Sequence, residues 1–343
     1  MAVLRNRFFI AALLVSGAAA AAEPAIYAIT ARQAMAGEGG WDYLSHDTGR
    51  NRLYVSRATR MQVVDTLTGK LVGEIADTPG VHGIALATDL NKGYISSGRA
   101  NAVRVVDLQS MQSTAVIATP QGENPDYIAY DASTQRVWAF NGRSRNASVL
   151  DARTDQLVAT VPLSGKPEAA VVDGRGHVFV DIEDRNEVAV LDAGGERVTG
   201  HFALPGCDEP AGLAIDVAAH RLFVGCHNKL LLVLNSDSGG VVAKLPIGEG
   251  VDATLFDAER HLLFSSQADG SLTIIKAVTP DQYKVIQTLS TPLGARTMAL
   301  NAKTHEIYLM AAEYDEQPAS APQQRPQRVM RPGSAQLLVV TPR

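Results

Sequence analysis

The chain has 343 residues, of which 46% are hydrophobic and 20% are charged, and its formal net charge is −5. This composition excludes a disordered chain and a strongly acidic or basic one. The length alone predicts two or three domains of roughly 150 residues each.

The N-terminal segment has the layout of a cleaved secretory signal peptide. Arg5 and Arg7 precede an apolar run of eight residues, and a series of small residues then ends at Ala22. We therefore expect residues 1–22 to be a signal peptide and the protein to be periplasmic. The apolar run is too short to span a bilayer, so we expect no membrane span after cleavage. Loss of Arg5 and Arg7 takes the net charge from −5 to −7, which argues against general nucleic-acid binding.

An aspartate that follows a short apolar segment recurs through the chain at intervals of about 42 residues. Its positions are Asp47, Asp89, Asp131, Asp173, Asp216, Asp257 and, with asparagine in place of aspartate, Asn301. A second series closes Val-rich segments at Asp65, Asp107, Asp151, Asp192 and Asn235. Two independent series that share one period indicate a repeat architecture.

Each repeat unit contains four short strand patterns separated by turn residues. Four strands in about 42 residues, repeated seven times, predict an all-β, seven-bladed β-propeller with four-stranded blades. The last unit contains only three strand patterns, and the segment 25–30 can supply the missing one. We therefore expect residues 23–343 to form a single propeller domain that an N-terminal strand closes, because closure removes exposed sheet edges.

The repeat units carry the motif of a known family. The motif is clearest in Arg52-Leu53-Tyr54-Val55-Ser56 with the following residues 63–72, and weaker copies lie at 149–154 and 221–224. They resemble the YVTN repeat of the YncE-like exported β-propellers. The resemblance covers nearly all of the chain after residue 22 and implies the same fold. It also implies a binding scaffold without an assigned reaction.

The chain has only two cysteines, Cys207 and Cys226, which we expect on the upper face of blade five. An exported protein meets an oxidising compartment, so we predict a disulfide between them. Two free thiols are one alternative. A metal site that also uses His227 is the other.

One polar residue precedes the innermost strand of nearly every predicted blade, so these residues should surround the upper mouth of the channel. They are Trp41, Asp42, His82, Asp126, Glu168, Glu209, Asp252 and Arg296, and His227 is expected on the same face. Carboxylates and histidine can bind a cation or transfer protons, and the alternative is an ordinary solvated channel mouth. Their spacing lacks the tight pattern of metal ligands, so we predict no metal site and no cofactor, with a single divalent cation as the open alternative.

The upper loops have an uneven distribution of charge. Blades one to three carry Arg57, Arg60, Arg99, Arg143 and Arg145, whereas blade four carries Glu183, Asp184 and Glu187. An arginine-lined half of the funnel could bind a small anionic ligand, because guanidinium pairs well with carboxylate or phosphate. The alternative is ordinary loop charge.

Residues 313–334 interrupt the last blade with four prolines and several arginines. This composition predicts an extended or mobile loop on the upper face, without a packed strand. The loop could serve as a lid or a partner-docking segment, and a tolerated insertion without a role is the alternative.

The chain contains no nucleophile–base motif, no nucleotide-binding glycine motif and no haem-attachment motif. We therefore expect a monomeric binding protein of the cell envelope rather than an enzyme. Its partner would be an envelope protein or a small anionic ligand on the upper face. The alternative is a metal-dependent, lactonase-like propeller hydrolase. Its cation would be bound by residues among Asp126, Glu168, Asp252 and His82.

Overall fold

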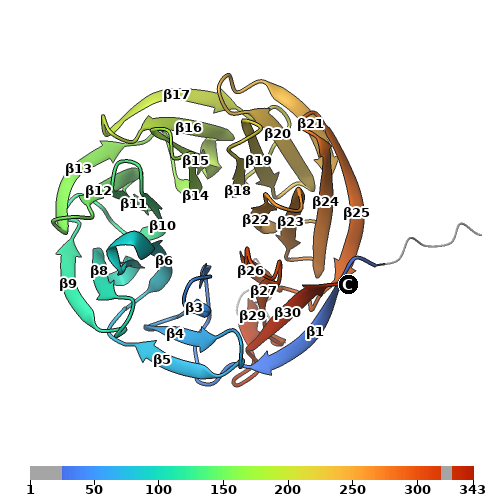
Figure 1. The fold of residues 1–343 in the computed structure, drawn as a ribbon, viewed down its shortest axis with the longest axis horizontal. Helices are drawn as coiled ribbons and strands as arrows, with labels where there is room; N and C mark the ends of the chain where they lie inside the picture. The colour runs from blue at the N-terminus through green and yellow to red at the C-terminus, as the bar shows by residue number, and fades with distance from the viewer. Residues whose placement is uncertain (1–24, 318–326) are drawn as a thin grey trace, which may run out of the picture.

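The computed structural model describes residues 25–317 and 327–343, and within them seven four-stranded antiparallel sheets surround a central channel (Figure 1). The helical segments of this part are the short 3₁₀ turns η1 (Thr88–Leu90), η2 (Gly98–Ala100) and η3 (Glu183–Arg185). No helix of the described ranges has the length and apolarity needed to cross a membrane. The expected signal peptide, residues 1–22, lies outside the described residues.

In blades one to six the strands follow one another outwards from the channel in chain order. Blade one contains β2 (Leu44–Asp47), β3 (Arg52–Arg57), β4 (Arg60–Asp65) and β5 (Leu71–Ile75). Blade two contains β6 (Val81–Ala87), β7 (Lys92–Ser97), β8 (Ala102–Asp107) and β9 (Ser113–Ala118). Blade three contains β10 (Pro125–Asp131), β11 (Arg136–Asn141), β12 (Asn146–Asp151) and β13 (Gln156–Pro162).

The next three blades repeat this order. Blade four contains β14 (Pro167–Val172), β15 (His177–Ile182), β16 (Glu187–Asp192) and β17 (Arg197–Ala203). Blade five contains β18 (Pro210–Asp216), β19 (Arg221–Cys226), β20 (Leu230–Asn235) and β21 (Val241–Pro246). Blade six contains β22 (Val251–Asp257), β23 (Leu262–Gln267), β24 (Ser271–Thr279) and β25 (Gln282–Ser290).

The recurrent aspartates end or closely follow the innermost strands, and in five blades their carboxylates accept hydrogen bonds from the turn that comes next. The Oδ1 atom of Asp47 accepts a hydrogen bond from Arg50 N at 3.0 Å, and Asp216 Oδ1 accepts one from Ala219 N at 3.0 Å. Such hydrogen bonds from backbone amides to a side chain give partners to amide groups that the sheet leaves unpaired. The period of the sequence therefore reflects a turn that recurs in most of the blades.

Blade seven closes the ring with the N-terminal strand, as the sequence predicts. It contains β26 (Arg296–Leu300), β27 (Ile307–Ala311), β30 (Gln336–Pro342) and, outermost, β1 (Tyr27–Ala34). β1 pairs antiparallel with β30, with Tyr27 opposite Pro342 and Ala34 opposite Gln336. The first and last strands of the described chain, β1 and β30, thus lie side by side in one sheet (Figure 1).

The hydrophobic core lies in layers between neighbouring blades. On β15, Val178 and Val180 belong to the cluster shared with blade three, whereas Phe179 belongs to the cluster shared with blade five. Successive side chains of a strand point to opposite faces, so each sheet buries apolar residues on both sides. Every blade therefore needs two neighbours.

The expectation that residues 313–334 contain no strand is wrong at both ends of the insertion. β28 (Tyr314–Gln317) and β29 (Gln327–Met330) form a two-stranded antiparallel ribbon, with Tyr314 opposite Met330. The guanidinium of Arg328 lies 5.2 Å from the centre of the Tyr314 ring. Three of the four prolines fall in the segment 318–326, which lies outside the described residues, so the flanking residues keep the amide groups that strand pairing needs.

Ring closure also depends on a side chain of blade six. The Oε1 atom of Gln287 accepts hydrogen bonds from Ile26 N and Tyr27 N, each at 3.0 Å, and its Nε2 atom donates to Tyr27 O at 2.8 Å. Replacement Gln287→Ala leaves these backbone groups without their partner. We expect the free energy of unfolding to fall by about 2 kcal/mol in urea denaturation.

The matched control for this variant is Gln282→Ala on the same strand, where the side chain is exposed. We expect a change within about 0.5 kcal/mol for the control. Equal stability of the two variants would show that closure does not depend on Gln287.

Candidate functional site

The polar residues of the predicted ring surround the upper mouth of the channel. His82, Asp126, Glu168 and Asp252 are each the second residue of the innermost strand of their blade. At this point the pairing between the innermost and second strands shifts register in six of the seven described blades. A bulge of this kind redirects a side chain away from the regular pleat. The repeated bulge therefore explains how His82, Asp126, Glu168 and Asp252 come to the mouth from equivalent positions in their blades.

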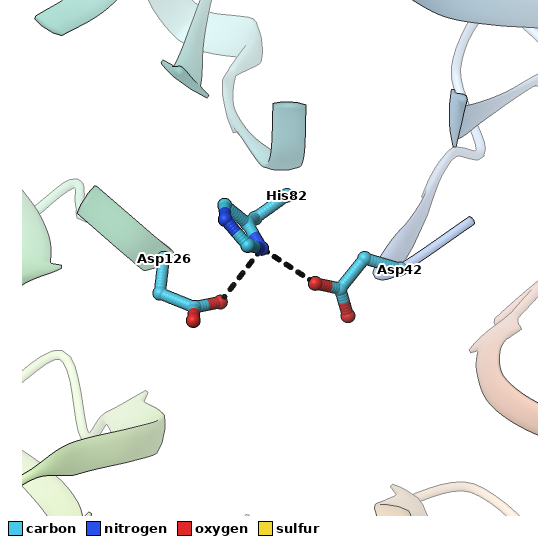
Figure 2. Close-up of side chains that lie close together, drawn as sticks. All are labelled: Asp42, His82 and Asp126. Atoms are coloured by element: carbon cyan, nitrogen blue, oxygen red, sulfur yellow. Dashed lines mark hydrogen bonds and ion pairs between the residues drawn. The ribbon is translucent and has the colours of Figure 1, made fainter. Parts of the chain in front are cut away.

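Asp42, His82 and Asp126 form a cluster across three blades (Figure 2). The Nδ1 atom of His82 lies 2.6 Å from Asp42 Oδ2 and 3.2 Å from Asp126 Oδ1. Burial by itself lowers the pKa of His82, but the hydrogen bond to Asp42 and the charge of Asp126 outweigh it and raise the pKa to about 9. At neutral pH the ring is therefore a positively charged imidazolium that pairs with both carboxylates.

A second group of charges lies beside this cluster. The hydroxyl of Tyr43 donates to Glu168 Oε1 at 3.1 Å, and Lys166 Nζ lies 3.3 Å from Glu168 Oε2. Lys166 also pairs with Glu183. Burial and the charge of Asp126 raise the pKa of Glu168 to about 7. Burial raises the pKa of Asp126 to about 6, although His82 opposes this shift.

Asp252 and Arg296 belong to blades six and seven. The guanidinium of Arg296 lies 5.7 Å from the centre of the Trp41 ring, and its Nε atom is 3.9 Å from Asp252 Oδ2. That carboxylate oxygen is buried and accepts no hydrogen bond from the described residues. Burial raises the pKa of Asp252, against the charge of Arg296. Trp41 is 5% exposed, so its role is to support Arg296 rather than to offer a free stacking face.

A cavity of about 240 Å³ lies in the channel beside these groups. Its apolar lining includes Ile84, Ile128, Val171, Leu213, Ile215, Leu255, Phe256 and Met298, and its polar lining includes Tyr43, Tyr127, Asp252 and Thr254. The rings of Tyr43 and Tyr127 meet edge to face, with centres 4.9 Å apart. The sequence analysis predicts a polar mouth but misses the apolar cavity. The sequence did contain a signal for this cavity: on the innermost strands, apolar residues such as Ile84, Ile128 and Val171 follow the polar residues of the mouth.

The upper-loop arginines do not form the expected lining of a funnel. Arg57 is fully buried and donates to Gly37 O at 2.7 Å, so it is not available to a ligand in the mouth. Arg60 pairs with Glu74 at 3.2 Å, and Arg145 pairs with Asp184 at 3.0 Å. Of the arginines predicted in these loops, Arg99 and Arg143 are exposed without a side-chain partner among the described contacts.

Blade five carries the disulfide that the sequence predicts. Cys207 and Cys226 are bonded, with their Cα atoms 5.4 Å apart. Since both sulfurs are engaged, the alternatives of two free thiols or of a metal site with His227 do not apply. His227 instead pairs with Glu209 at 2.9 Å, at the exposed rim of the mouth.

Comparisons with known proteins agree with this architecture. Two proteins, each called "Uncharacterized protein YncE", from Salmonella typhimurium and Salmonella typhi, are 23% identical to the chain over 243 residues. The chain is similar to the YncE proteins. These matches span 68% of this chain and 64% of the length of the relatives. The YncE-like resemblance in the sequence is thus confirmed, although no family model matches the chain.

A solved structure shares the fold at lower sequence identity. The chain titled "Kuenenia stuttgartiensis Hydrazine Synthase" superposes with a TM-score of 0.67 at 17% identity, over 79% of this chain and 92% of that chain. At this identity the likeness concerns the fold alone.

The imidazolium of His82 gives a testable titration. Its folded-state pKa of about 9 exceeds the ordinary value of 6.5, so the charge stabilises the fold below pH 6.5 and this contribution is lost as pH rises through 9. Replacement Asp42→Asn removes one carboxylate, and we expect the pKa of His82 to fall, as followed by ¹⁵N-detected NMR of the ring. Glu249→Gln, an exposed carboxylate paired with Lys229, should leave it unchanged. An unchanged pKa in Asp42→Asn would contradict the assigned cluster.

The disulfide joins residues that are 19 positions apart. Closing a loop of this length restricts the unfolded chain, so the double variant Cys207→Ser/Cys226→Ser should lose about 3 kcal/mol of unfolding free energy. Urea denaturation measures this loss. The reductant-treated native chain should match the variant, and a variant as stable as the oxidised protein would refute a stabilising role.

Proposed function

We propose that the protein is an exported, non-enzymatic binding protein of the cell envelope that takes its ligand at the channel mouth. The observation that carries this proposal is the convergence of Asp42, His82, Asp126, Glu168 and Asp252 beside an apolar cavity. A concave apolar site with a few convergent polar groups is the usual form of a ligand pocket. The N-terminal pattern and the disulfide support export, because disulfides persist in oxidising compartments.

The protonation of His82, rather than the geometry of the cluster, disfavours the alternative of a metal-dependent hydrolase. The ligand atoms of Asp42, His82 and Asp126 lie within 4.8 Å of one another, which is close enough for a shared ion. However, His82 Nδ1 already faces both carboxylates, and its pKa of about 9 keeps a proton there at neutral pH. A divalent cation would have to displace this proton, because a metal ligand must be the neutral imidazole.

The charge balance of the mouth favours a positively charged ligand over the anionic one that the sequence suggests. Two cations of the mouth are already engaged: His82 by Asp42 and Asp126, and Lys166 by Glu168 and Glu183. Arg296 lies over the Trp41 ring, with its Nε atom 3.9 Å from Asp252 Oδ2. An incoming anion would meet partly buried carboxylates, and like charges in such a place repel strongly.

Retention of periplasmic components by the immobilised full chain tests the proposal. The double variant Glu168→Gln/Asp252→Asn alters the mouth. Glu249→Gln/Asp281→Asn makes the same charge change at exposed positions and serves as the matched control. Mass spectrometry should identify a component that the native protein and the control retain and the mouth variant loses. Equal retention by both variants, or no retained component, would overturn the proposal.

A further inference from the structure

We propose that the ligand of the channel mouth is a small organic cation: a primary amine whose apolar group enters the cavity and whose ammonium group lies against Asp252 and Glu168. This inference rests on the proposed function of the mouth and names the chemical class of its ligand. Three features of the site support it independently: the size and lining of the cavity, its unpaired acceptor atoms, and the distribution of charge.

The cavity fits an apolar group of limited size. Its volume is about 240 Å³, and much of its wall consists of aliphatic side chains together with Phe256 and Met298. A dry apolar cavity of about 150 Å³ holds a benzene molecule. The channel therefore has room for a phenyl ring with a short chain, or for an alkyl chain of comparable volume.

Two acceptor atoms in residues that line the cavity lack hydrogen-bond partners among the described residues. They are Asp252 Oδ2, which is buried, and Thr254 Oγ1, in a residue only 3% exposed. The nearest cationic atom to Asp252 Oδ2 is Arg296 Nε, which is 3.9 Å away and too distant for a hydrogen bond. Buried acceptors without partners are costly, so a ligand that brings N–H donors would be favoured here.

One side chain of the cavity wall lies among the charges of the mouth: the hydroxyl of Tyr43 donates to Glu168 Oε1 at 3.1 Å. The charges of Glu168, Asp126, Asp42 and Asp252 all act on the hydroxyl of Tyr43, whose pKa burial and these charges raise well above its ordinary value. Tyr43 itself lines the cavity. A cation beside this hydroxyl would face several carboxylates, and an ammonium group offers three donors for them.

The lining also explains why an organic cation fits better than a metal ion. Divalent metals such as Mg²⁺ or Ca²⁺ need six or more oxygen ligands around them. Beside Asp252 the cavity wall offers Leu255, Phe256 and Met298, which cannot coordinate such an ion. An amine uses both kinds of surface, because its nitrogen meets carboxylates and its carbon atoms meet the apolar wall.

Isothermal titration calorimetry of the full chain at pH 7 with three chemically matched probes tests the charge. The probes are n-hexylamine, 1-hexanol and hexanoate. We expect the amine to bind at least tenfold more tightly than the alcohol and the carboxylate not to bind. In the series from ethylamine to n-hexylamine, each added CH₂ group should raise the affinity about fourfold until the cavity is full.

Variants of the mouth locate the site. Asp252→Asn and, separately, Glu168→Gln should each weaken n-hexylamine binding at least tenfold and leave 1-hexanol binding nearly unchanged. Glu249→Gln should bind all probes as the native chain does, because that carboxylate is exposed and pairs with Lys229. Thermal unfolding confirms that each variant is folded, and the two mouth variants provide independent readings if one of them is not.

The failures of this inference and of the proposed function are distinguishable. Equal affinity for amine and alcohol, or tighter binding of hexanoate, would refute the cationic ligand while mouth-dependent retention of a periplasmic component still stands. Tighter binding of MnCl₂ than of any amine, lost in Asp42→Asn, would replace the amine with a divalent cation. Absence of binding by every probe would also overturn the inference, and loss of mouth-dependent retention as well would overturn the proposed function.

Discussion

Each blade of the propeller is apolar on both faces, and this single constraint requires every blade to have a neighbour on each side. Phe179 and Val180 are adjacent on one strand, yet they belong to the cores of two different blade pairs. A closed ring gives every sheet of this kind a neighbour on both faces. Blade seven lacks an outer strand from its own repeat unit, so β1 completes it and Gln287 fixes the start of β1. The innermost strands of the blades surround the axis of the ring, and the space that they leave there is the central channel (Figure 1).

The fold was predictable because its signals are local and repeated. Asp47 accepts a hydrogen bond from the backbone three residues later, and a side-chain acceptor recurs at the equivalent position along the chain, as aspartate or, at Asn301, asparagine. The ring of polar residues at the mouth was predicted in the same way, because one position before each innermost strand recurs from unit to unit. The pairing of Asp42, His82 and Asp126 was not predictable, because it joins three blades whose relative positions only the closed ring determines.

The errors of the sequence analysis arise from contacts between segments far apart in the chain. Arg57 has the pattern of an exposed loop arginine, but the segment that leads from β1 to β2 provides Gly37 O as its partner and buries it. The ends of the insertion form a ribbon because Tyr314 meets Met330 and Arg328 across it. Neither contact has a repeat pattern from which it could be inferred.

The electrostatics of the mouth work against the stability of the fold. The pKa of Asp126 is raised to about 6 and that of Glu168 to about 7, so both keep their protons in the fold over a pH range where the unfolded chain has released them. The contribution of both groups to the free energy of unfolding is therefore lost as pH rises through these values. The contribution of His82 is likewise lost as pH rises through about 9. Charges placed so unfavourably are typical of functional sites. A bound cation would reverse the penalty on the carboxylates, which gives the mouth a physical reason to bind one.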